Sequence, residues 1–184
     1  MAFKDAFAEF PVLETDNLLL RQLTEDDAED FYTVWADPGM QAGFDAKGFS
    51  GIAGARRHIR VKGNAFKRKQ ILAWGIAPKD SFGIVGACFY GAFEHQSVAE
   101  LGYYLSGPHW GKGIMSQALQ AVVPFGFEVM GLHRIQAFIR PDNLGSVRVA
   151  EKAGLVREGL LRRYHRTPQG TWADKAVYAR IQDD

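Results

Sequence analysis

The stretch GPHWGKGIMSQAL, residues 107–119, places three glycines around a lysine, immediately before a segment with helical spacing of apolar residues. Glycines let a backbone approach a ligand closely, and the free N–H groups at a helix start attract phosphate. The spacing nevertheless departs from that of a P-loop. Three residues, rather than four, separate the first glycine from the Gly-Lys pair, and Gly113 stands where a magnesium-binding Ser or Thr is required.

A dinucleotide-binding fingerprint does not fit this loop either. It would need a third glycine at Ser116 and an acid about 20 residues later, at the end of a second parallel strand. Neither feature is present in the sequence. Two interpretations therefore stay open at this point: a loop that holds a diphosphate, and a glycine-rich turn from strand to helix with no ligand.

Hydrophobic patterns predict the elements on both sides of the loop. The loop is followed by an amphipathic helix over 113–130, in which Pro124 is expected to cause a kink near Gln120 because proline removes a backbone donor. Strand-like runs precede the loop and suggest an antiparallel meander over 70–77, 82–93 and 98–105. The chain is then predicted to close with a strand over 133–139, a helix within 141–155 and a hairpin of 156–166 with 171–181. In that helix Asn143 or Asp142 is the expected N-cap, and Gly154 is the expected C-terminal stop.

The first third of the chain is predicted to form one strand and two helices. A strand over 17–23 is followed by a helix over 25–37, which Thr24 opens with a variant of the capping box. Pro38 ends that helix, and the glycine-rich segment Asp37–Ser50 is predicted to be a loop. A basic helix of uncertain bounds follows, from about Gly51 to Lys69. With no repeat and no linker, the pattern predicts one mixed α+β domain over residues 1–184.

Composition limits the classes of protein to consider. The 184 residues are 47% hydrophobic with a net charge of +1, which fits a globular protein and does not favour general nucleic-acid binding. No apolar run reaches the length of about 18 residues that a membrane span needs, and no signal peptide is recognisable, so we expect a cytoplasmic protein without membrane contact. Cys88, the single cysteine, lies in an apolar run and is expected to pack in a strand.

Charge is distributed unevenly along the chain. Residues 1–45 hold eleven acids and only two Lys or Arg, whereas residues 46–79 hold nine Lys or Arg and no acid. An acidic and a basic helix that attract each other would explain this pattern, and a local anion site is the alternative. No pair among the five histidines has the spacing of metal ligands, so no metal site is expected.

Three segments together resemble a known family. They are AELGYYLSGPHWGKGIMSQAL at 99–119, GLHRIQAFIRPDNLGSVRVAEKAGLVREGLLR at 131–162, and GTWADKAVYA at 170–179. Their order and spacing resemble the GNAT N-acetyltransferases, and among these the RimJ/RimL type that acetylates the N-terminal amino groups of ribosomal and other proteins. The resemblance implies a mostly antiparallel, seven-stranded sheet that is splayed between its fourth and fifth strands and flanked by about four helices.

The resemblance also implies an acetyl-CoA site, with the glycine loop holding the pyrophosphate and the pantetheine arm lying between the splayed strands, here 99–105 and 134–139. Trp110 and Met115 depart from the wider family pattern, although Trp is common in the RimJ/RimL type. The cofactor-binding residues carried over by position are Leu101, Tyr103, Trp110, Gly111, Lys112, Gly113, Ile114, Met115, Ser116, Asn143 and Ser146.

The chemistry of acetyl transfer needs a neutral amine, a stabilised oxyanion and a protonated thiol leaving group. Glu100 is the candidate base, acting directly or through water, and an exposed strand Glu without that role is the alternative. Many relatives use a tyrosine as the acid, but Ala150 occupies that position here, so Ser146 is proposed instead, unless its hydroxyl only serves the first turn of its helix. Tyr103, Tyr104 and Tyr164 are secondary candidates.

Three functions follow from this interpretation. The first is direct transfer of acetyl to a protein N-terminal α-amine in a ternary complex, because such an amine has a pKa of about 8 against about 10.4 for lysine. The others are acetylation of a small amine or antibiotic, and a non-catalytic acyl-CoA sensor. The basic residues Arg162, Arg163, His165 and Arg166 form either a solvated face or a surface that attracts an acidic protein segment. The resemblance also allows a homodimer.

Overall fold

The computed structural model describes residues 3–44, 47–81 and 83–182. Its strands form one sheet in the order β1-β2-β3-β4-β5-β6-β8-β7. The strands are β1 (Leu13–Glu14), β2 (Leu18–Gln22), β3 (Leu72–Pro78), β4 (Gly86–Glu94), β5 (Val98–Leu105), β6 (Arg134–Ile139), β7 (Val156–Arg166) and β8 (Trp172–Ile181). The mixed, mostly antiparallel fold is therefore confirmed, with eight strands in the described residues because the short β1 pairs with β2.

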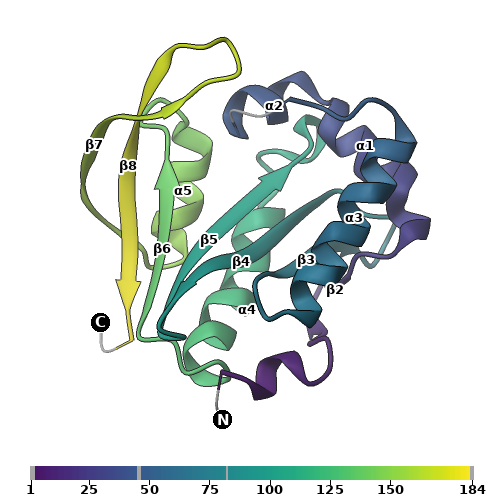
Figure 1. The fold of residues 1–184 in the computed structure, drawn as a ribbon, viewed down its shortest axis with the longest axis horizontal. Coiled ribbons are helices and arrows are strands. Elements are labelled where there is room, and N and C mark those ends of the chain that lie inside the picture. Colours follow the sequence, from purple (N-terminus) through teal and green to yellow (C-terminus); the bar gives the residue numbers. More distant parts are fainter. Residues whose placement is uncertain (1–2, 45–46, 82, 183–184) are drawn as a thin grey trace.

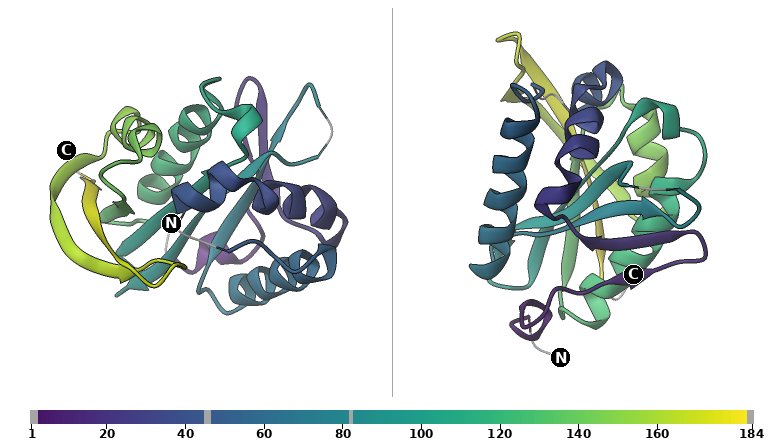
Figure 2. Two further views of the ribbon diagram at one scale, coloured as in Figure 1. Left: turned by 90° about the horizontal axis from the view of Figure 1, so that it is seen from above. Right: turned by 90° about the vertical axis from the view of Figure 1, so that its right-hand side faces the viewer.

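Helices cover both faces of this sheet. They are α1 (Ala28–Ala36), α2 (Pro38–Phe44), α3 (Ile52–Lys67), α4 (Ile114–Glu128) and α5 (Leu144–Lys152). Figure 2 shows α1 and α3 on one side of the sheet and α4 and α5 on the other. Two hydrophobic clusters correspond to these layers, a larger one that includes α4 and a smaller one that includes α1 and α3. The sheet thus has a separate core on each face.

The predicted meander and closing hairpin are both confirmed. β3, β4 and β5 pair antiparallel in chain order, and β7 pairs antiparallel with β8. Cys88 lies fully buried in β4, where burial raises the pKa of its thiol, in agreement with the predicted packing role. Helix α4 runs from Ile114 to Glu128 with Pro124 inside it, and the kink expected near Gln120 stays a prediction.

The prediction of a loop over Asp37–Ser50 is wrong for its first half. Residues 38–44 form α2, which begins with Pro38 at a position where a helix needs no N–H donor. Asp37 Oδ1 accepts a hydrogen bond from Met40 N at 2.7 Å, and Met40 is buried. The sequence Asp-Pro is a helix start signal, but two glycines in the following six residues masked it. Residues 45–46 of the predicted loop lie outside the described residues.

The uneven charge along the chain reflects attraction between two helical segments. Glu25, in the 3₁₀ turn before α1, pairs with Arg60 at 3.0 Å and Arg56 at 4.0 Å, both on α3. All three side chains are about half-exposed, so these pairs add little stability, but they agree with the first of the two interpretations of the charge pattern. Within the described part of the chain, no helix is both long and apolar enough to cross a membrane.

A partly buried ion pair joins β2 to the start of α1. Both oxygens of the buried Asp27 accept hydrogen bonds from Arg21, at 2.6 and 2.8 Å, and Oδ2 also accepts from Thr24 N at 2.7 Å. Burial by itself would raise the pKa of Asp27, but the bonds from Arg21 and Thr24 outweigh burial and lower it below its ordinary value. The carboxylate is therefore held in its charged form.

We expect Asp27→Asn to lower the free energy of unfolding by about 2 kcal/mol, because it leaves the Arg21 guanidinium without its charged partner. Since the pKa of Asp27 is lowered on folding, its contribution is present at neutral pH and is lost as the pH falls through the folded-state value. Urea unfolding at pH 7 and pH 3 measures both effects. Asp26→Asn, an exposed neighbour on the same turn, is the matched control, and equal losses in the two variants would contradict the prediction.

Candidate active site

The strands β5 and β6 separate partway along their length. They run parallel and pair only at Val98 with Arg134, Ala99 with Ile135 and Glu100 with Gln136. Beyond these positions β5 continues its pairing with β4, and β6 continues with β8. Figure 1 shows the two strands side by side at one end and apart at the other. The predicted splay is confirmed, and it leaves backbone groups of both strands facing a gap.

The glycine loop leads directly from β5 into α4. Gly111 and Gly113 have φ values of 72° and 78°, and Gly113 is the N-cap of α4. A Cβ at either glycine would meet nothing within 4 Å, so it is the backbone conformation that requires glycine there. The first N–H groups of α4, at Ile114, Met115 and Ser116, have no carbonyl one turn earlier in the helix. They form a set of donors suited to a phosphate.

Trp110 and Met115, the two residues that depart from the family pattern, both pack against neighbouring parts of the structure. Met115 is 6% exposed and its side chain belongs to the larger core, so only its backbone can serve the loop. Trp110 is half-exposed, and its Nε1 donates to Leu105 O at 2.7 Å. A Cβ at Gly39 would lie 2.7 Å from the Trp110 ring, which shows that the indole packs closely on α2. Lys112 is exposed at the outer side of the loop.

Glu100 lies at the last paired position before the strands separate. Strand alternation places it on the same face as Tyr104 and Phe89, opposite α4 and α5. Glu100 is half-buried, and this burial raises the pKa of its carboxyl, while the nearby positive charge of Lys175 on β8 opposes the rise. A carboxylate with a raised pKa at the floor of a gap is suited to accept a proton from an amine.

Aromatic side chains stand on both sides of Glu100. On the β4 side, the Phe89 ring covers Gly102, since a Cβ there would come within 2.1 Å of it. On the β6 side, the rings of Phe138 and Tyr164 are stacked at 5.3 Å with an angle of 17°. The sheet face that carries Glu100 therefore has aromatic side chains on both neighbouring strands, in agreement with the burial that raises its pKa.

Helix α5 borders the gap on the opposite face. Asn143, one of the two expected residues, is its N-cap, and its Oδ1 accepts from Ser146 N at 3.1 Å. Tyr103 Oη donates to Ser146 O at 2.8 Å, so β5 and α5 are joined across the gap. Ala150 is fully buried one turn further along. Burial raises the pKa of the Tyr103 hydroxyl, which keeps it a donor.

Helix α2, which the sequence analysis missed, connects the two halves of the site. Asn143 Nδ2 donates to Gly43 O at 3.2 Å, and Arg140 Nη1 donates to Ala42 O at 3.4 Å. Phe44 at the end of α2 packs edge-on against Tyr104 at 5.3 Å. The end of α2 therefore lies between the start of α5 and the aromatic face beside Glu100. No periodic pattern signalled this, because the contacts join residues about 60 to 100 positions apart.

Tyr104, a secondary candidate from the sequence, lies in the core rather than at the gap. Tyr104 is 5% exposed within the smaller core, and burial raises the pKa of its hydroxyl. Lys62 is not among the candidates; burial lowers its pKa to about 8, and its Nζ lies 4.6 Å from the centroid of the Phe89 ring. Within the described residues, no group of three His, Cys, Asp or Glu side chains is arranged to hold a metal ion.

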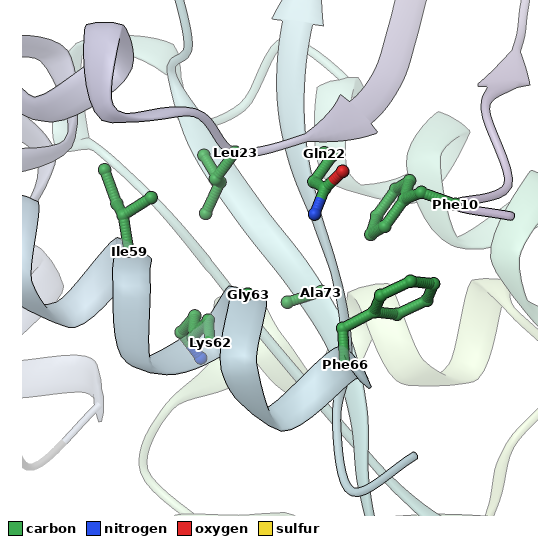
Figure 3. Close-up of a pocket in the computed structure, with 8 residues that line it drawn as sticks. All are labelled: Phe10, Gln22, Leu23, Ile59, Lys62, Gly63, Phe66 and Ala73. Carbon is green, nitrogen blue, oxygen red and sulfur yellow. The ribbon is translucent and has the colours of Figure 1, made fainter. Parts of the chain in front are cut away.

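A cavity beneath α3 is not part of this site. It has room for about 10 Å³, enough for one water molecule, and its lining is mostly apolar. Figure 3 shows its lining side chains, which come mainly from α3, β2 and β3 and not from β5 or β6. Its lining residues are Phe10, Gln22, Leu23, Ile59, Lys62, Gly63, Phe66 and Ala73.

Comparison with known proteins agrees with this geometry. Residues 17–156 match the acetyltransferase (GNAT) domain model. An uncharacterised N-acetyltransferase YoaA of Bacillus subtilis is 33% identical, over 94% of this chain and 98% of its own length. The [Ribosomal protein uS5]-alanine N-acetyltransferase of Escherichia coli is 25% identical, over 94% of this chain and 91% of its own.

A solved structure of RimL, a ribosomal L7/L12 alpha-N-protein acetyltransferase in complex with coenzyme A, superposes with a TM-score of 0.81. It is 22% identical, and the match covers 95% of this chain and all of that one. The family match, the relatives and this agreement in fold lead to the same conclusion. The chain belongs to the GNAT family and is an acetyl-CoA-dependent acyltransferase.

Proposed function

We propose that this enzyme transfers acetyl from acetyl-CoA to the N-terminal α-amino group of a protein. The observation that carries the proposal is Glu100, a half-buried carboxylate of raised pKa at the point where β5 and β6 separate. The match to the [Ribosomal protein uS5]-alanine N-acetyltransferase of Escherichia coli covers nearly the whole chain, which supports a protein amine as the acceptor. The proposal implies that the enzyme acts in the cytoplasm, because protein N-termini are synthesised there.

The cosubstrate would lie across the loop and the gap. The residues present fit its pyrophosphate, because the backbone from Trp110 to Ser116 offers N–H groups at the start of a 15-residue helix and Lys112 adds a positive charge. Its pantetheine arm would run between β5 and β6, with Asn143 near the sulfur. Acetyl-CoA supplies an activated acyl group, and a thiol is the leaving group.

The chain's own residues would then divide the chemistry among them. Glu100 accepts a proton from the acceptor's ammonium group, directly or through water, so that the neutral amine can attack, and its raised pKa brings it closer to that of an α-amine. Backbone N–H groups between Leu101 and Tyr103 stabilise the oxyanion. Ser146 donates a proton to the leaving sulfur. Its backbone is held from both sides, by Asn143 Oδ1 and by Tyr103 Oη.

The acceptor class is tested by turnover on a panel of amines. We expect peptides that begin with Ser or Ala to be acetylated with at least tenfold higher kcat/KM than polyamines or aminoglycosides, because an α-amine with a pKa of about 8 needs less help to lose its proton. The measurement is thiol release, with the product mass locating the acetyl group. Peptides with a blocked N-terminus and a free lysine are the control. A higher kcat/KM for polyamines or aminoglycosides would contradict the proposal and favour a small-amine acetyltransferase.

A further inference from the structure

The hairpin of β7 and β8 carries an open groove of about 810 Å³. Its lining residues are Leu160, Leu161, Arg162, Arg163, Tyr164 and Asp174. An irregularity of β7 shapes it, because the pairing with β8 shifts between Leu161 and His165 and Arg163 has a φ of 50°. Asp174 Oδ1 accepts from Arg163 N at 2.7 Å, which holds this uncommon conformation in place.

The surface of the hairpin is strongly basic. Residues 156–181 include six Lys or Arg and two acids. Both acids are engaged: Glu158 accepts two hydrogen bonds from Arg134, at 2.5 and 2.8 Å, and Asp174 accepts from the backbone of Arg163. Among the described residues, no acid lies within ion-pair distance of the exposed guanidinium groups of Arg162 and Arg163. The groove therefore offers two cations to a ligand.

The groove begins close to Glu100. Tyr164 in its lining stacks on Phe138 at 5.3 Å, and Phe138 lies two residues beyond Gln136, the pairing partner of Glu100. Two residues of strand span about 7 Å. Lys175 lies on β8, the strand between β6 and β7, and its positive charge is close enough to Glu100 to lower the pKa of that carboxyl. An extended peptide with its amino group at Glu100 would therefore reach the groove by about its third residue.

We propose that this groove binds residues three to six of the acceptor's N-terminal segment and selects acidic side chains there. The inference rests on the proposed function and names a narrower acceptor class for it. Arg162 and Arg163 supply the charge complementarity, and the exposed side chains of Leu160 and Tyr164 supply apolar contact beside it. Such charges outside the reacting centre act on KM rather than on the chemical step.

The test uses Ser-starting peptides of equal length that carry Glu, Gln or Lys at positions three to six. The full-length enzyme should show about a tenfold lower KM for the Glu peptide than for the Lys peptide, and high salt should reduce this difference. The double variant Arg162→Glu with Arg163→Glu should reverse the order, with the KM for acetyl-CoA unchanged. Arg162→Glu alone, which leaves the irregular position intact, should remove most of the preference.

Arg57→Glu with Lys67→Glu, two exposed changes on α3, is the matched control for net charge. If the two double variants changed the peptide KM values equally, the proposed role of the groove would be contradicted. Equal KM values of the unaltered enzyme for the three peptides would contradict it as well. Direct binding of acetylated peptides is measured in parallel by fluorescence anisotropy, so the groove is tested even if no peptide turns over. Absence of turnover would instead count against the proposed function. Tighter binding of a short RNA than of the Glu peptide would contradict the proposal that the ligand of the groove is a peptide.

Discussion

Glu100→Gln is expected to lower kcat at neutral pH by about 100-fold while leaving the Kd of acetyl-CoA unchanged. The amide has nearly the same shape as the carboxylate but cannot accept the amine's proton. Because Glu100 lies on the face opposite α4 and α5, the change does not touch the loop or α5. Steady-state kinetics with a Ser-starting peptide and calorimetry with acetyl-CoA measure the two quantities separately.

The pH profile gives a second readout of the same residue. Burial raises the pKa of Glu100, so its base function is present above that raised value and is lost as the pH falls through it. The acidic limb of kcat against pH should therefore lie above the ordinary pKa of Glu, about 4.3, and should be absent from the Gln variant. Glu94→Gln, an exposed position in the hairpin that joins β4 to β5, is the control. Unchanged turnover in Glu100→Gln would exclude Glu100 as the base.

Gly113→Val is expected to weaken acetyl-CoA binding by about 100-fold. A branched residue resists the φ of 78° that Gly113 adopts, so the loop must change its path. Two or more hydrogen bonds to a charged phosphate would then be lost, each worth about 1.5–3 kcal/mol. Calorimetric titration with acetyl-CoA measures the change in Kd directly.

Gly51→Val is a close control for this substitution. Gly51 is the N-cap of α3, has a φ of 87°, and would also place a Cβ in open space. Both variants should lose similar unfolding free energy, about 1–2 kcal/mol from backbone strain. Only Gly113→Val should lose cofactor affinity, because only that glycine begins the helix beside the gap. Equal Kd values in the two variants would mean that the loop does not hold the pyrophosphate.

Local signals were sufficient for most of the elements. The meander follows from apolar runs broken by turns, and the caps at Thr24, Asn143 and Gly154 are all found in the structure. Each of these signals depends on residues within a few positions of one another, so a single sequence contains it in full. The predicted cofactor residues also lie along one path, from the loop across the gap to α5.

Helix α2 and the groove on the hairpin could not be predicted in the same way. α2 has seven residues, two of them glycine, and it is held by groups distant in the chain, such as Asn143 on Gly43 O. The groove depends on Asp174 meeting the backbone of Arg163 across the hairpin. Contacts of this kind have no period, and a sequence pattern does not show them.

The sequence by itself determined the order of strands and helices apart from β1 and α2, the glycine loop before α4 and the identity of Glu100 and Ser146 as candidates. Only the tertiary structure decided how these groups meet. The pKa of Glu100 rises because the fold buries its carboxyl on a face shared with Phe89 and Phe138, from the neighbouring strands β4 and β6, while Lys175 from β8 opposes the rise. Burial and charge act through space, so residues that set the chemistry of one carboxylate are spread over nearly 90 positions of the chain.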